Sequence, residues 1–296
     1  MNLPGYPFTP KQFEVRPGLS MSYLDEGPRD GEVVVMLHGN PSWSYYWRNL
    51  VSGLGDKYRC IVPDHIGMGF SDKPADRDYD YTLQSRIDDV GALLNHLGIT
   101  GLVTLAVHDW GGMIGFGWAL SHAPQVKRLV ITNTAAFPLP SAKKMPWQLS
   151  LGRDSKFGAF LIRAFNAFSG GASYIGVEKK MPADVRRAYV SPYDSWANRI
   201  STVRFMQDIP LHPGDKAWAL VESAGQKLQQ FADRPVFIGW GLKDFVFDKH
   251  FLAGFRAALP VAEVHAFDDA GHYVLEDKAA ELVPAIRAFL DRNPLP

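Results

Sequence analysis

The strongest constraint on the fold is an alternation of short apolar runs with helical patterns along the first 135 residues. The apolar runs are rich in valine, isoleucine and leucine, and they cover residues 33–37, 60–62, 102–107 and 129–132. Such continuous runs are typical of parallel strands that are buried on both faces. Helical patterns at 82–97 and 112–122 lie between them. This order of strands and helices predicts a parallel sheet with right-handed crossovers.

The alternation stops between residues 135 and 215, where seven prolines separate helical pieces and no strong strand run occurs. It then returns, with strand patterns at 236–240 and 264–267 and helical patterns at 217–230, 251–259 and 279–290. We therefore expect residues 1–135 and 216–296 to form one α/β core. Residues 136–215 are expected to form a helical cap that is inserted into this core.

One stretch of the expected cap, residues 157–168, is predicted to be a helix rich in phenylalanine. A pocket lined by this helix would suit long alkyl chains, because burying each methylene is worth about 0.8 kcal/mol. The same side chains are equally suited to the core of the cap itself, since large apolar residues are interior by default. A share of them that faces outward would suit a partner or a membrane.

Composition excludes several classes of function. The chain has 31 Lys and Arg against 31 Asp and Glu and no basic tract, which argues against nucleic acid as a partner. Cys60 is the only cysteine, so no intrachain disulfide can form. Residues 1–10 lack the pattern of a secretory signal, and no apolar run is long enough to span a bilayer. We therefore expect a cytoplasmic protein without predicted membrane association. No metal or cofactor is expected either, and no two histidines have ligand spacing beside acids on one predicted helix.

The candidate nucleophile is Asp109. The apolar run 102–107 leads directly into His108-Asp109-Trp110-Gly111-Gly112 and then into a predicted helix. Such a turn projects its central side chain over the carboxyl end of the sheet, and the small residues after it allow strand and helix to approach closely. A carboxylate in this position can attack carbon without a base to activate it. The alternative is that Asp109 only caps the following helix.

His272 and Asp244 are the candidate base and orienting acid. Asp269-Ala270-Gly271-His272 follows the last predicted strand, and Gly241-Leu242-Lys243-Asp244 follows the strand at 236–240. The order nucleophile, acid, histidine is that of α/β-hydrolases. Asp248 and Asp269 compete for the orienting role, but Asp244 lies nearest to a strand end. If His272 acts as a base, activity should fall on acidification through a pKa of about 6.5.

Asn40 and Trp110 are the candidate groups for binding a leaving anion. His38-Gly39-Asn40-Pro41 follows the strand run 33–37, the position from which α/β-hydrolases contribute an oxyanion-hole N–H. The side-chain amide of Asn40 and the indole N–H of Trp110 are further donors without a titratable proton. The alternative is that Asn40 forms a turn before proline and Trp110 fills the core.

Taken together, these motifs resemble those of haloalkane dehalogenases in the α/β-hydrolase superfamily. The resemblance covers nearly the whole chain and includes the segments 38–44, 63–74, 108–112 and 241–244 and Gly271-His272. It implies a mostly parallel eight-stranded sheet with helices on both faces and an inserted helical cap. Asn40 with Trp110 matches the halide-binding pair of dehalogenases, whereas epoxide hydrolases usually carry an aromatic residue in place of Asn40.

A closer resemblance links the segments 133–140, 146–148 and 201–210 to the third dehalogenase subfamily. That branch includes the β-lactone decarboxylases of bacterial long-chain olefin biosynthesis, which turn cis-3-alkyl-4-alkyl β-lactones into cis-alkenes and carbon dioxide. The resemblance therefore implies this reaction, with a hydrophobic small-molecule substrate and Asp109 as nucleophile. It also implies the β-lactone synthetase and the ketoreductase of the pathway as partners. Whether Asp109 attacks the ring carbon or the carbonyl stays open at this point.

Three other functions are weighed against decarboxylation. The first is haloalkane dehalogenation, in which Asp109 forms an alkyl ester that water then hydrolyses with the help of His272. The second is epoxide hydrolysis, which needs cap tyrosines to protonate the opening oxygen, and Tyr174, Tyr189 and Tyr193 are candidates. The third is a non-catalytic binding protein with a hydrolase fold, because a fold alone does not establish a function.

Overall fold

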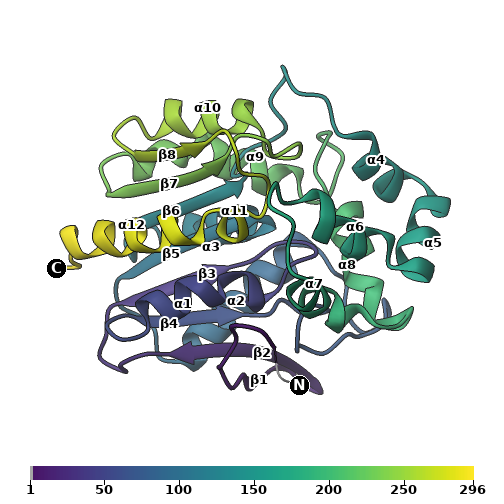
Figure 1. Cartoon of the computed structure of the whole chain (residues 1–296), viewed down its shortest axis with the longest axis horizontal. Coiled ribbons are helices and arrows are strands. Elements are labelled where there is room, and N and C mark those ends of the chain that lie inside the picture. Colours follow the sequence, from purple (N-terminus) through teal and green to yellow (C-terminus); the bar gives the residue numbers. More distant parts are fainter. Residues whose placement is uncertain (1–2) are drawn as a thin grey trace.

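The computed structural model describes residues 3–296, so the first two residues of the expected segment 1–135 lie outside it. Its centre is one eight-stranded sheet (Figure 1). The strands are β1 (Lys11–Arg16), β2 (Leu19–Glu26), β3 (Val33–Leu37), β4 (Arg59–Pro63), β5 (Val103–Asp109), β6 (Val126–Thr134), β7 (Val236–Gly241) and β8 (Glu263–Phe267).

The strands follow the order β1-β2-β4-β3-β5-β6-β7-β8 across the sheet. From β4 to β8 every neighbouring pair is parallel, and only the β1–β2 and β2–β4 pairs are antiparallel. Strand β5 lies between β3 and β6, so the residues that follow β3 and β5 meet at the same edge. The predicted mostly parallel eight-stranded sheet is confirmed.

Helices cover both faces of the sheet (Figure 1). Along β3, Val35 and Leu37 pack into one apolar cluster and Val34 and Met36 into the other, as the alternation of side chains in a strand requires. The helices of the core are α1 (Arg48–Leu54), α2 (Leu83–His96), α3 (Trp110–His122), α9 (Trp218–Gln226), α10 (Lys249–Ala258), α11 (Val274–Asp277) and α12 (Ala279–Arg292). Short 3₁₀ helices are η1 (Ser44–Trp47), η2 (Ser191–Tyr193), η3 (Ala197–Arg199) and η4 (Leu228–Phe231).

The sequence patterns did not reveal β1, β2 and α1. Strand β1 is an edge strand in which half-buried and exposed residues alternate, so it lacks the apolar run that marked the central strands. Strand β2 has serines between its apolar residues and ends with two acidic residues. Helix α1 has only seven residues, which is too short for a clear helical period.

Residues 136–215, the expected cap, contain five α-helices and no strand. The helices are α4 (Trp147–Asp154), α5 (Lys156–Phe165), α6 (Ala167–Ile175), α7 (Ala183–Val190) and α8 (Ile200–Gln207). The prediction of a single helix over 157–168 was wrong. The chain leaves α5 at Asn166, whose φ of 53° is left-handed, and α6 begins at the next residue. Asparagine tolerates this conformation better than most residues, which explains why the helix ends there.

Within residues 3–296, no helix combines the length and the apolar character that crossing a bilayer requires. The longest helices, α2 and α12, have 14 residues each. Both are amphipathic and pack one face against the sheet.

Candidate active site

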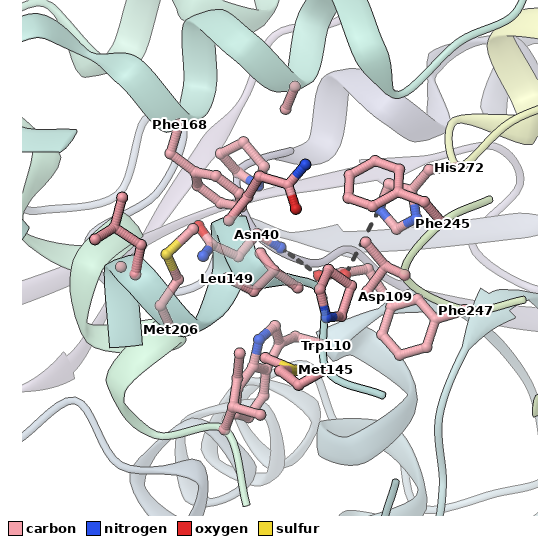
Figure 2. A pocket seen from close by; sticks show the side chains of 18 of the residues that line it. Asn40, Asp109, Trp110, Met145, Leu149, Phe168, Met206, Phe245, Phe247 and His272 are labelled. Carbon is pink, nitrogen blue, oxygen red and sulfur yellow. Dashed lines mark hydrogen bonds and ion pairs between the residues drawn. The ribbon is translucent and has the colours of Figure 1, made fainter. Parts of the chain in front are cut away.

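Asp109 lies at the sharp turn between β5 and α3. Its backbone has φ 52° and ψ −128°, a conformation that costs free energy in a non-glycine residue. The side chain makes no capping hydrogen bond to α3, so the helix-cap alternative does not account for this aspartate. Instead, the peptide N–H of Asn40 donates to Oδ1 of Asp109 over 2.6 Å. The turn holds the carboxylate in the wall of a cavity, as predicted for a nucleophile elbow (Figure 2).

The turn depends on Gly111, where α3 approaches the end of β3. A Cβ atom at this position would lie 2.0 Å from the carbonyl oxygen of Leu37. We therefore expect Gly111→Ala to lower the free energy of unfolding by about 1–3 kcal/mol or more, because backbone must move to relieve the clash. Thermal melts of the variant and the parent measure this loss. Gly170→Ala is the matched control, since a Cβ there has no neighbour within 4 Å, and equal melting temperatures for all three proteins would contradict the close approach.

His272 connects Asp109 to Asp244. Its Nε2 lies 3.6 Å from Oδ2 of Asp109, and its Nδ1 lies 2.8 Å from Oδ2 of Asp244. All three side chains are buried. The competing acids have other partners: Asp248 caps α10 and pairs with Lys143, and Asp269 pairs with Lys278. The geometry therefore favours Asp244 as the acid that orients the imidazole.

Asn133 holds Asp244 in place, a role that the sequence did not reveal. Its Nδ2 donates to Oδ2 of Asp244 over 3.0 Å, and its Oδ1 accepts a hydrogen bond from the N–H of Gly241. The end of β6 carries no carboxylate, so it offers no second candidate for the orienting acid. A buried amide at the end of a central strand, beside the strand that leads to Asp244, was the available signal.

Burial and charge change the ionisation of the two groups that face the cavity. Burial raises the pKa of Asp109, although His272 and the N–H groups of Trp110 and Asn40 oppose this shift. Burial lowers the pKa of His272, but Asp244 and Asp109 outweigh this effect and raise the pKa above 6.5. At a given pH, a larger share of His272 is therefore protonated than of a free histidine, and its titration is expected above pH 6.5.

Asn40 and Trp110 differ in whether their side-chain N–H groups already have a hydrogen-bond acceptor. The side-chain amide of Asn40 donates to the carbonyl of Thr202 on α8 over 3.0 Å, which leaves one of its two amide hydrogens unused. The indole N–H of Trp110 has no acceptor within the described residues 3–296. Both residues line the cavity beside Asp109 (Figure 2). A leaving anion near Asp109 would thus meet one free indole N–H and one free amide hydrogen.

The cavity has a volume of about 310 Å³ and lies between the sheet edge and helices α4 to α6. Its wall is almost entirely apolar: besides Asn40, Asp109, Trp110 and His272, the polar groups among its lining residues are Lys143, Gln148 and the indole N–H of Trp147. Lys143 is already engaged with Asp248 and the carbonyl of Phe245. Within residues 3–296, no three His, Cys, Asp or Glu side chains are grouped as a metal site. The site is thus a carboxylate and an imidazole in an apolar chamber.

Of the three roles considered for the phenylalanines of 157–168, lining the chamber applies to Phe168 alone. Phe168 lines it together with small and aliphatic residues of α5 and α6. Phe157, Phe160 and Phe165 are 63%, 49% and 71% exposed. The apolar residues of α5 do recur with helical spacing. Which of them are exposed depends on the elements that pack against the helix.

Comparison with known proteins shows which family this chain is similar to. The family described as "alpha/beta hydrolase fold" matches residues 32–279. The chain belongs to the α/β-hydrolase fold family. It is 73% identical over 300 residues to the cis-3-alkyl-4-alkyloxetan-2-one decarboxylase of Xanthomonas campestris, with both chains fully covered. It is 54% identical to the enzyme of the same name from Shewanella oneidensis, covering 95% of this chain and 88% of the relative.

Among solved structures, a putative ancestral haloalkane dehalogenase superposes on this α/β-hydrolase chain with a TM-score of 0.86. The two are 26% identical, and the match covers 95% of this chain and 98% of the dehalogenase. The predicted resemblance to dehalogenases and, more closely, to the β-lactone decarboxylases is confirmed. The much higher identity to the decarboxylases separates these two groups of relatives.

The tyrosines that an epoxide hydrolase would need do not line the cavity. Tyr174 is 61% exposed at the surface of α6. The buried hydroxyl of Tyr189 donates to Glu276, and that of Tyr193 donates to the carbonyl of Ser42. With no tyrosine placed to protonate an opening epoxide, the geometry of this α/β-hydrolase disfavours epoxide hydrolysis.

Proposed function

We propose that this chain decarboxylates cis-3-alkyl-4-alkyl-oxetan-2-ones, releasing a cis-alkene and carbon dioxide. The observation that carries the proposal is the carboxylate of Asp109 at the elbow, facing a chamber that is otherwise almost entirely apolar. Such a chamber suits a substrate with two alkyl chains and one small polar ring. The relatives that bear this activity in their names match nearly the whole chain.

In the first step, Asp109 attacks C4 of the lactone, the ring carbon that bears the ring oxygen. A carboxylate lone pair forms the new C–O bond, and the bond between C4 and the ring oxygen breaks. Its electrons pass to the ring oxygen, which becomes part of a carboxylate attached to C3. Ring strain favours this opening, and the attack needs no prior proton transfer because the nucleophile is already an anion.

In the second step, the bond between C3 and its carboxylate breaks and carbon dioxide leaves. The released electrons form the C3–C4 double bond, and the bond between C4 and Asp109 breaks, so the free carboxylate is restored. Backside attack places the Asp109 oxygen opposite the C3 carboxylate. Loss of both groups from opposite sides then returns the alkyl chains to one side, which yields the cis-alkene. The cycle consumes neither water nor a proton.

The surrounding donors have roles that follow from charge. The free hydrogens of Asn40 and Trp110 would stabilise the carboxylate that departs from C4. His272, as an imidazolium 3.6 Å from Asp109, would keep the nucleophile ionised and add positive charge near the departing anion. Asp244 and Asn133 would hold the imidazole in this orientation. Helices α4 to α8 of residues 136–215 would act as the cap that keeps water away.

Haloalkane dehalogenation is the second candidate. The observation in its favour is the pair of hydrogen-bond donors without acceptors beside Asp109. A halide leaving group would meet the same indole and amide hydrogens. That reaction differs because the alkyl ester must be hydrolysed, which requires His272 to accept a proton from water. The raised pKa of His272 leaves less of the neutral base at pH 7, which favours the water-free reaction.

Incubation with a cis-3,4-dialkyl β-lactone and, separately, with 1-bromobutane tests the proposal. We expect cis-alkene from the lactone, detected by gas chromatography with mass spectrometry, and little or no bromide from 1-bromobutane. Bromide release without alkene would instead establish a dehalogenase. A trans-alkene from the cis-lactone would contradict the opposite-side loss of the two groups.

The place of this reaction in metabolism is part of the proposal. A chain that consumes dialkyl β-lactones fits long-chain olefin biosynthesis, and we propose the β-lactone synthetase and the ketoreductase of that pathway as its partners. The basis is the resemblance of the chain to the olefin-pathway decarboxylases.

A further inference from the structure

Helix α5 and the segment before η3 expose a group of large aromatic side chains. Phe157, Phe160, Phe165 and Trp196 are each between 47% and 71% exposed, and we call these four residues the outer aromatic patch. The ring of Phe160 lies 6.1 Å from that of Phe165 and 5.9 Å from that of Trp196. Contiguous apolar surface of this kind is uncommon on a monomer unless something binds there.

The segment that carries the patch is also the positive part of the molecule. Residues 136–215 contain eleven Lys and Arg against six Asp and Glu, a net charge of +5. The rest of the chain contains 20 against 25, a net charge of −5. On α5 itself, Lys156 is exposed and Arg163 stacks its guanidinium 4.4 Å from the ring of Trp196. Positive charge therefore lies beside the exposed rings.

The same helices form the wall of the chamber. Leu161 and Ile162 of α5 line the cavity, while Phe157 and Phe160 of the same helix face solvent. Trp147 and Ile175 line the cavity and are also 69% and 56% exposed, so the chamber reaches the surface near α4 and α6. In Figure 1, α4, α5 and α6 lie on the side of the molecule away from the C-terminus.

We propose that the outer aromatic patch binds the surface of a lipid bilayer that contains anionic lipids. Aromatic and aliphatic side chains enter the boundary between headgroups and acyl chains, and nearby lysines and arginines are attracted to the negative surface. The charge of −5 on the rest of the chain would turn the core away from the membrane. A second copy is a poorer occupant, because a symmetric contact would bring together two segments of net charge +5.

Membrane binding extends the proposed function and rests on it, because the reason for it is a substrate with two long alkyl chains. A lactone with two long alkyl chains partitions into bilayers, and the alkene product is more apolar still. An enzyme that docks with the wall of its chamber against the membrane can exchange such molecules without passing them through water.

Sedimentation of the full chain with phospholipid vesicles tests the proposal. We expect stronger binding to vesicles of phosphatidylcholine with phosphatidylglycerol than to phosphatidylcholine alone, and weaker binding at high salt. Phe157→Ser combined with Phe165→Ser should weaken binding about tenfold or more, because two exposed rings are lost. Lys156→Glu should weaken it about fivefold or more on anionic vesicles only. The first helical position of α5 tolerates glutamate well, so this variant should fold.

The matched controls are Val261→Ser and Arg256→Glu, which change an exposed apolar residue and an exposed cation of the core. Both should bind vesicles as the parent does. The proposal is overturned if the parent ignores anionic vesicles, or if the patch variants bind as tightly as it does. It is also overturned if light scattering shows a parent dimer that the phenylalanine substitutions convert to a monomer. Alkene formation from lactone dispersed in detergent micelles should be the same in the parent and in all variants. If the parent binds vesicles but forms no alkene, the proposed function fails and the membrane proposal stands.

Discussion

Asp109→Asn is expected to abolish alkene formation and to leave the fold intact. Asparagine has nearly the same shape as aspartate, but its neutral amide cannot form the ester with C4 of the lactone. We expect the rate to fall by about 10⁴-fold or more, as for the loss of other covalent nucleophiles. Burial raises the pKa of Asp109, which means that the ionised carboxylate is less stable in this site than it would be in water. The neutral variant should therefore melt at the same temperature as the parent or higher.

Alkene quantification in single-turnover reactions, together with thermal melts, measures both effects. The control is Asp248→Asn, which changes another acid of the same sheet edge that pairs with Lys143 and does not touch His272. This variant should keep most of the activity, although it removes an ion pair. If Asp109→Asn instead turns over at the rate of the parent, Asp109 is not the nucleophile and the mechanism fails at its first step.

Alkene formation is expected to fall as the pH rises through the pKa of His272. The structure raises this pKa above 6.5, since Asp244 and Asp109 stabilise the imidazolium more than burial disfavours it. In the water-free mechanism the imidazolium is the working form, because it keeps Asp109 ionised and stabilises the departing carboxylate. The rate should be high below this pKa and should fall by about 10- to 100-fold above it, the size of effect that one electrostatic partner has in a buried site. A pH–rate profile under single-turnover conditions measures this.

The sign of that profile separates the two candidate reactions. General-base hydrolysis of an alkyl ester requires neutral His272, so its rate would rise with pH through the same pKa. His272→Gln is the control, and its rate of alkene formation should be low and independent of pH across this range. A parent profile that rises with pH, together with a variant that accumulates an ester on Asp109, would show that water takes part and that His272 acts as a base.

The central fold and the positions of the main candidate residues were readable from the sequence because they depend on local patterns. Buried parallel strands appear as continuous apolar runs, and a turn such as His108-Asp109-Trp110-Gly111-Gly112 has few conformations that avoid a clash. Asn40 and Asp244 were found because each follows a buried strand, and the carboxyl ends of parallel strands share one edge. Strand β1 was missed because it is an edge strand without a continuous apolar run, and β2 was missed because serines interrupt its apolar residues.

The tertiary structure decided everything that depends on which groups become neighbours. Asn133 supports Asp244, and Tyr189 and Tyr193 point their hydroxyls away from the chamber, through contacts between residues far apart in the chain. The raised pKa of His272 follows from two carboxylates that the fold brings to its ring. The break at Asn166 and the outward phenylalanines of α5 likewise follow from packing. Sequence periodicity shows that a helix has an apolar face, but contact with neighbouring elements determines whether that face meets the core, the chamber or the surface.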